Sequence, residues 1–164
     1  MSAARPFLAV FRAGRGTVHR RMMAEDPGRN GDCALNASES PKTIPGPANE
    51  EIGFLDGSHK YEGFASYLQR ERERVLRYRY VLLADDDIYF QPGDLSRLFE
   101  LCEEHGIYLG QPSLRWRTNV NHSVTMRNPA SRVRRVSFVE VMTPVFSTAA
   151  LLEPEHEEAV TADA

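Results

Sequence analysis

The sequence predicts an α/β fold, in which a sheet is flanked by helices. The first reason is the run Tyr80 to Ala84 (YVLLA), which is short and apolar throughout. Such a run is typical of a strand buried on both faces, and strands of that kind belong to parallel sheets covered by helices. The second reason is the apolar run Phe7 to Arg12, which leads into a glycine-containing turn. A strand followed by such a turn is the usual opening of an α/β domain.

Composition limits the classes of protein that the chain can belong to. Its 164 residues are enough for one domain with a core, and its formal net charge of −3 gives no field for binding nucleic acid. Cys33 and Cys102 fit no metal-binding spacing, so we expect buried thiols in a reducing compartment. The apolar run 7–11 is too short for a signal peptide, and no run is long enough to span a membrane. We therefore expect a cytoplasmic protein.

The first third of the chain is predicted to contain a strand at 7–12, a helix at 17–23 capped by Thr17, and strands at 32–37 and 52–55. The glycines of the turn Ala13-Gly14-Arg15-Gly16 do not form GxGxxG, so no dinucleotide site follows. Asp32 is either a ligand contact at a strand margin or an ordinary turn-side acid. Residues 38–51 are rich in Pro, Gly and Ser, which predicts a loop.

The remainder is predicted to contain helices at 61–77 and 94–105 and strands at 80–84, 107–110, 120–127 and 133–146. The first helix has apolar residues at helical spacing, and the second has Pro92 and Asp94 at its start and Gly106 as its cap. The last two strands are predicted from moderate alternation and from a high content of valine. We expect one domain at residues 5–150 and an acidic tail at 151–164.

Three adjacent carboxylates, Asp85, Asp86 and Asp87, directly follow the strand at 80–84. In open α/β sheets, ligands bind beyond the carboxyl ends of the strands. Alternate residues of an extended chain point the same way, so Asp85 and Asp87 are predicted to face one hard cation while Asp86 turns elsewhere. Oxygen ligands with few protein contacts suit Mg²⁺ or Mn²⁺ carrying substrate phosphates. The alternative is a solvated turn after a strand.

Lys60 and Glu140 are further candidates, each with an ordinary alternative. Lys60 follows a turn and is either a phosphate contact or a surface lysine. Glu140 lies inside an apolar run, where a carboxylate is costly unless it is paired. An ion pair with Arg134 or Arg135 would satisfy it, and a catalytic acid is the other interpretation.

Several blocks of the chain resemble, in the same order, a glycosyltransferase-like family long known as a domain of unknown function. The matching blocks are Phe11 to His19 (AG…LH turn), Arg29 to Asp32 (RNxD), Tyr80 to Ile88 (D-D/E-D), Gly110 to Leu114 (QPAL), Val120 to Arg127 (HxxTxR) and Phe138 to Ala150 (VEMMAPVFSRAA). Together they cover most of residues 7–150. The last block is far more specific than a DxD motif alone.

The resemblance implies a single Rossmann-like mixed sheet of the GT-A type, which binds a nucleotide-diphospho-sugar donor and a carbohydrate acceptor. In GT-A enzymes the acidic motif holds Mn²⁺ or Mg²⁺ against the diphosphate, where the metal offsets charge on the leaving group. The resemblance implies that Asp85 and Asp87 contact the metal or the ribose, and that Asp32, Ala13 and Gly14 lie near the nucleoside. It also implies that His122 and Glu140 lie near the acceptor or structure the pocket, and we take these two as the catalytic candidates. Lys60 and Asp86 are taken as further donor contacts.

One departure from the family bears on activity. The family's Trp-Gly-Leu-Asp-like segment, which follows its VEMMAPVFS block, has no counterpart here, so we expect a chain that is truncated at its C-terminus or, alternatively, divergent there. Two alternatives follow, namely a metal-dependent glycosyltransferase-like domain and a non-catalytic remnant that binds a nucleotide or a carbohydrate. A phosphotransfer enzyme with an aspartate nucleophile fits less well, because Tyr89 stands where a Thr would be expected.

Overall fold

The computed structural model describes residues 5–14, 17–37, 51–55, 59–115 and 121–152. Its six strands form one sheet in the order β3-β2-β1-β4-β6-β5. The strands are β1 (Phe7–Ala13), β2 (Gly31–Ala37), β3 (Glu51–Leu55), β4 (Tyr80–Ala84), β5 (Leu109–Gly110) and β6 (Val145–Ser147). The first four are parallel, whereas β6 is antiparallel to both β4 and β5. The predicted mixed α/β sheet is confirmed.

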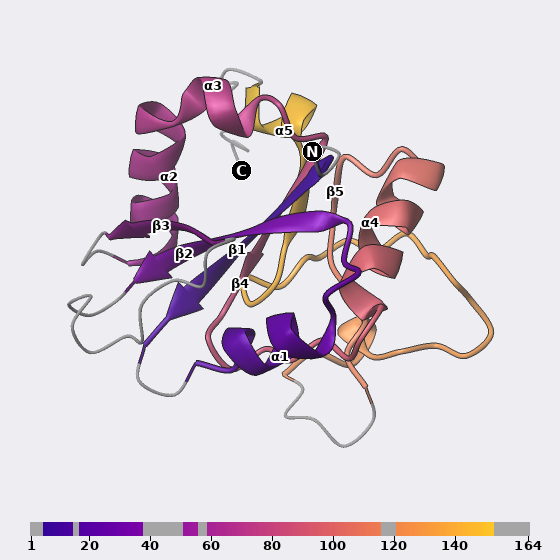
Figure 1. Cartoon of the computed structure of the whole chain (residues 1–164). Helices are drawn as coiled ribbons and strands as arrows, with labels where there is room; N and C mark the ends of the chain where they lie inside the picture. The colour runs from indigo at the N-terminus through magenta and orange to yellow at the C-terminus, as the bar shows by residue number, and fades with distance from the viewer. Residues whose placement is uncertain (1–4, 15–16, 38–50, 56–58, 116–120, 153–164) are drawn as a thin grey trace.

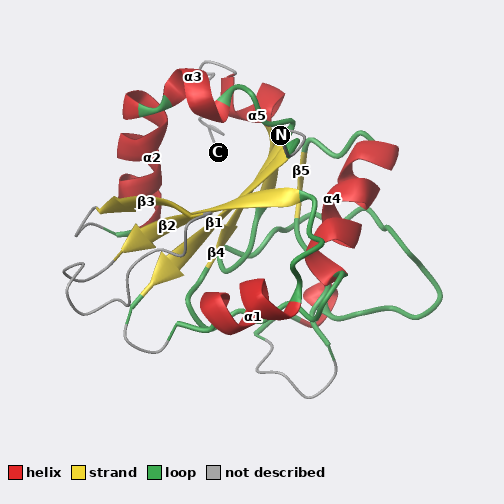
Figure 2. Cartoon of the chain, viewed as in Figure 1, coloured by secondary structure: helices red, strands yellow, loops and turns green. Residues whose placement is uncertain are grey.

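Helices cover both faces of this sheet (Figures 1 and 2). They are α1 (His19–Glu25), α2 (Lys60–Arg70), α3 (Arg72–Val75), α4 (Asp94–Glu104) and α5 (Thr148–Leu152). Figure 1 shows α2, α3 and α5 on one side and α1 and α4 on the other. Among the described residues, no helix has both the length and the apolar character needed to cross a membrane.

Side chains alternate between two buried clusters, one on each face of the sheet. Phe7, Ala9 and Phe11 of β1 belong to the cluster under α1 and α4, whereas Leu8 and Val10 belong to the cluster under α2 and α3. This is the two-residue period of a strand. The same period decides which side chains at the strand ends face α2, and these make up the candidate site.

Three predicted elements differ from the structure. The helix at 61–77 is interrupted at Glu71, which leaves helical geometry and separates α2 from α3. The strand at 120–127 is wrong, because Ser123–Thr125 form a 3₁₀ turn and a single bridge joins Leu114 to Met126. The strand at 133–146 is also wrong up to Pro144, since β6 begins at Val145, although the carbonyl oxygens of Met142 and Pro144 accept hydrogen bonds from the amides of Asp85 and Leu83.

The physical reason for the wrong strands is exposure. Val136, Phe138 and Val141 are exposed, and strand propensity reflects packing against a sheet more than a preference of the backbone. Smaller differences occur at α1, where Val18 is the N-cap and the Thr17 hydroxyl contacts Nδ1 of His19 instead of capping. The predicted loop at 38–51 and the predicted tail at 151–164 lie mostly outside the described residues.

Gly63 provides a test of how closely α2 packs on the sheet. A Cβ added at Gly63 would lie 2.6 Å from Nδ2 and 2.9 Å from Oδ1 of Asn36. Gly to Ala inside a helix usually stabilises by about 1 kcal/mol. Here we expect Gly63→Ala to destabilise by about 1–3 kcal/mol, because the buried Asn36 amide cannot move aside freely. Chemical denaturation will measure this, with Ser66→Ala on the exposed face of α2 as the matched control; a stabilised Gly63→Ala variant would contradict the packing.

Candidate functional site

Polar side chains replace the apolar ones where β1, β2 and β4 end. Leu8 and Val10 of β1 pack with Val81 and Leu83 of β4 on the face covered by α2. The same alternation of side chains reaches Arg12 in β1, and it reaches Asp85, the residue directly after β4. Asn36 of β2 is the register partner of Arg12. The carboxyl edge of the sheet therefore presents Arg12, Asn36 and Asp85 towards the start of α2.

Lys60, the first residue of α2, is the centre of this arrangement. Its Nζ lies 2.9 Å from Oδ1 of Asp85 and donates hydrogen bonds to the carbonyl oxygens of Val141 (2.6 Å) and Met142 (2.8 Å). An ammonium group has three protons, and these three oxygens use all of them. Burial lowers the pKa of Lys60, although Asp85 and Asp87 act in the opposite direction. Lys60 thus links α2, the end of β4 and residues 141–142.

Asn36 holds Arg12 and the start of α2 together. The buried amide accepts a hydrogen bond from Nη1 of Arg12 (3.1 Å) and donates one to the carbonyl oxygen of Lys60 (3.1 Å). Within the described part of the chain, the guanidinium makes no other hydrogen bond or ion pair, so most of its five N–H donors remain open. Sequence reasoning missed both residues. The signal in the sequence was a charged or amide residue at the end of an apolar strand, an even number of residues after side chains that are buried under α2.

The three aspartates do not all behave as the alternating pattern predicts. β4 ends at Ala84 and the chain turns at Asp86 and Asp87, so the two-residue period does not continue beyond Asp85. The carbonyl oxygen of Asp86 accepts a hydrogen bond from the Val18 amide (3.0 Å), which fixes the turn against the approach to α1. Asp87 is exposed and close enough to act on Lys60 electrostatically.

The fit of a divalent cation can be judged from these contacts. Among the described residues, no three His, Cys, Asp or Glu side chains come together to hold a metal. Mg²⁺ can be held by one or two carboxylates and substrate phosphates, so two aspartates would in principle suffice. The carboxylate of Asp85, however, already contacts an ammonium. A cation placed there would be repelled by Lys60, so the residues do not fit a metal unless Lys60 leaves.

Asp32 does not join the other predicted donor contacts. It is the register partner of Leu8 near the start of β2, about 13 Å along the strand from Asn36 at ~3.3 Å per residue. The hydroxyl of Tyr78 donates to Asp32 (2.8 Å), and burial together with this bond raises the pKa of Tyr78. Ala13 and Gly14, in contrast, lie at the carboxyl end of β1 and are buried there.

The two predicted catalytic residues lie in the segments that follow β5. His122 is exposed, and its ring lies 4.6 Å from that of Phe138. Glu140 is 4% exposed, and neither carboxylate oxygen has a hydrogen-bond partner in the described part of the chain. The predicted ion pair with Arg134 is wrong, because that guanidinium donates to the carbonyl oxygens of Val124 and Met126. Glu140 therefore remains an unpaired buried carboxylate, which is a costly arrangement.

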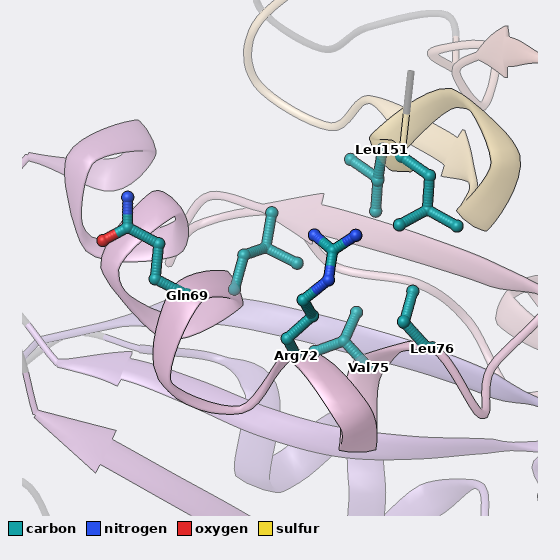
Figure 3. Close-up of a pocket in the computed structure, with 7 residues that line it drawn as sticks. Gln69, Arg72, Val75, Leu76 and Leu151 are labelled. Carbon is teal, nitrogen blue, oxygen red and sulfur yellow. The ribbon is translucent and has the colours of Figure 1, made fainter. Parts of the chain in front are cut away.

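A separate apolar groove lies between α2, α3 and α5 (Figure 3). Its lining consists of Leu68, Gln69, Arg72, Val75, Leu76, Leu151 and Leu152. Val75 and Leu76 precede β4, and α5 follows the end of β6 that pairs with Tyr80. The groove is therefore at the opposite end of the sheet from Asp85, and it is not part of the charged site.

Comparison with known proteins bears on the fold. No family model and no curated protein sequence matches the chain. A crystal structure of a candidate nucleotide-diphospho-sugar transferase from Desulfovibrio desulfuricans G20 is similar over 90% of this chain and 65% of its own, with 11% identity and a TM-score of 0.51. The structure of S. aureus TarS 1–349 aligns over 87% of this chain and 47% of its own, with 10% identity and a TM-score of 0.45.

The chain thus spans 65% of the length of the first neighbour and 47% of the second. At 11% identity the likeness concerns the fold and not the activity. No matching family model supports the finer resemblance to a domain of unknown function. The conclusion from the comparison is that the chain has a mixed α/β fold similar to that of the Desulfovibrio protein.

Proposed function

We propose that residues 5–150 form a glycosyltransferase-like domain that binds a nucleotide-diphospho-sugar at the carboxyl edge of its sheet. The observation that carries this proposal is the convergence of Asp85, Lys60 and Arg12 at the ends of parallel strands. In open α/β sheets this edge is where ligands bind. A diphosphate needs cationic partners, and Lys60 and Arg12 supply them beside the acidic turn. The similarity in fold to a candidate nucleotide-diphospho-sugar transferase supports the same assignment.

The roles of the remaining donor contacts follow from their positions. Ala13 ends β1 and Gly14 follows it at the same edge of the sheet, where a nucleoside is proposed to bind. Asp86 lies in the adjoining turn. Coordination of Mn²⁺ or Mg²⁺ by Asp85 and Asp87 stays a prediction, and it requires Lys60 to move away from Asp85. Asp32 is left out of this proposal, because it lies towards the other end of β2.

A carbohydrate acceptor is proposed to bind over the segment 138–141. Phe138 and Tyr61 are exposed aromatic residues, and the Tyr61 hydroxyl donates to the carbonyl oxygen of Val141 (3.1 Å). Exposed apolar surface of this kind marks ligand-binding grooves. His122 lies against Phe138, and Glu140 is the carboxylate in the same segment. We assign these two residues as the acid–base candidates for transfer.

The second candidate function is nucleotide or carbohydrate binding without transfer. It is favoured by the burial of Glu140, both of whose carboxylate oxygens are closed to solvent. A general base must come within hydrogen-bond reach of the acceptor hydroxyl. The arrangement described here therefore suits binding, and transfer requires Glu140 to become accessible. A cytoplasmic location stays a prediction.

Thermal denaturation with UDP, GDP, CDP and their sugars, with and without Mn²⁺, tests donor binding. A ligand that binds only the folded state stabilises it by mass action, and the free energy of unfolding rises by about 2.7 kcal/mol at a ligand concentration of a hundred times Kd. The melting temperature rises accordingly. We expect one nucleotide class to have this effect, and Asp85→Asn to remove the shift because Lys60 or a metal loses its anchor. Glu100→Gln, which alters an exposed ion-paired acid on α4, is the control. A cooperative transition that no nucleotide shifts would contradict the proposal.

Glu140→Gln separates a catalytic role from a structural one. A buried neutral amide is less costly to desolvate than an unpaired carboxylate, so we expect the melting temperature to stay the same or to rise. We also expect nucleotide binding to persist while hydrolysis or transfer of the donor sugar falls about 100-fold or more. Calorimetry and release of nucleoside diphosphate measure the two effects, with the exposed Glu62→Gln as control. Unchanged sugar release in an active preparation would remove Glu140 from the catalytic set.

A further inference from the structure

We propose that the cations facing the donor diphosphate are the protein's own Lys60 and Arg12, so that nucleotide binding needs no divalent metal ion. The inference rests on the proposed function and specifies how that site recognises a diphosphate. Its starting point is the disagreement between the metal predicted for Asp85 and the ammonium that lies there.

The ammonium of Lys60 occupies a position suited to a hard cation. Three oxygens surround it, from the carboxylate of Asp85 and from the carbonyls of Val141 and Met142, at 2.6–2.9 Å. Carboxylate and backbone carbonyl oxygens are also the ligands that hard cations seek. The side chain of Lys60 is only 14% exposed, and the three oxygens hold its ammonium at this position. A metal at Asp85 would have to displace a buried, fully hydrogen-bonded cation.

Arg12 supplies donors that the fold has oriented but not used. The buried Asn36 fixes one end of the guanidinium, because it accepts from Nη1 while its own amide donates to the backbone of Lys60. The planar guanidinium of arginine matches phosphate oxygens two at a time. Arg12 makes no further hydrogen bond in the described part of the chain, so a phosphate that accepts from its remaining donors would break no contact among the described residues.

Two cations, Lys60 and Arg12, lie at this edge of the sheet. Arg12 is close enough to Lys60 to contribute to the lowering of its pKa, so two cations stand near each other at a partly buried edge. Asp85 neutralises Lys60 directly, but no ion pair neutralises Arg12 among the described residues. A diphosphate placed between the two cations would relieve their repulsion. The carboxylates after β4 then serve to hold Lys60, and coordination of a metal is not required of them.

Lys60 must exchange one partner to contact a phosphate, because its three protons are already used. The exchange that keeps its anchor retains Asp85 and gives up the carbonyl oxygen of Val141 or Met142. We therefore expect one of the hydrogen bonds from Lys60 to the carbonyl oxygens of residues 141–142 to break when a diphosphate binds. Pyrophosphate, which carries the diphosphate without a nucleoside, is a suitable probe of this step.

Isothermal titration calorimetry with UDP, GDP and pyrophosphate, in EDTA and then in Mn²⁺, tests the inference. We expect binding in EDTA at an affinity that Mn²⁺ leaves nearly unchanged. Lys60→Met and Arg12→Met should each weaken it by about tenfold or more, the usual loss for a hydrogen bond to a charged group. Arg97→Met, which removes an exposed arginine from α4, should bind like the unaltered chain.

The possible failures are distinguishable. Nucleotide binding that requires Mn²⁺ and is insensitive to both substitutions overturns the inference and leaves the proposed function standing. Binding of pyrophosphate in EDTA without binding of any nucleotide supports the cation pair and overturns the proposed donor. Absence of all binding overturns both. If Lys60→Met does not fold, the EDTA comparison on the unaltered chain and Arg12→Met decide the question.

Discussion

The contact between Lys60 and Asp85 is the interaction on which the organisation of the site depends. One ammonium joins the first turn of α2, the end of β4 and the backbone at 141–142, which are far apart in the sequence. Ion pairs at exposed positions contribute little to stability, but this lysine is largely buried and also satisfies two carbonyl oxygens. Removing it would take the ammonium from the carboxylate of Asp85 and would leave the carbonyl oxygens of Val141 and Met142 with only the Tyr61 hydroxyl and the Asp85 amide as donors, so the effect extends beyond one ion pair.

The position of Lys60 depends in turn on how closely α2 approaches the sheet. Gly63, one turn after Lys60, packs against the amide of Asn36 at a distance that leaves no room for a side chain. The same amide contacts both Arg12 and the backbone of Lys60. A small residue in a helix and a buried amide in a strand thus set the spacing between the two cations. This spacing is a property of the packing, and the charges themselves do not determine it.

The core of the fold could be predicted from the sequence because its elements have strong local signals. The continuous apolar run at 80–84 and the helical period at 94–105 correspond to β4 and α4 within a residue. Strands are predicted at 120–127 and 133–146, but residues 121–144 contain a 3₁₀ turn and no strand, because valine and phenylalanine content does not reveal whether a partner strand exists. For the site, Asp85 and Lys60 could be named from motif and position, but their mutual contact could not. Arg12 and Asn36 were missed because their importance comes from register, which a single strand does not display.

Glu140 shows how the charged site and the segment 138–142 are connected. An unpaired carboxylate with both oxygens buried is destabilising, and it persists only when the surrounding contacts hold the segment in place. The two carbonyl oxygens that Lys60 binds belong to the residues directly after Glu140. If a diphosphate takes one of these bonds, the segment loses part of what keeps the carboxylate buried. Donor binding would then lower the cost of exposing Glu140 towards an acceptor, which gives a physical reason for the donor to bind before the acceptor.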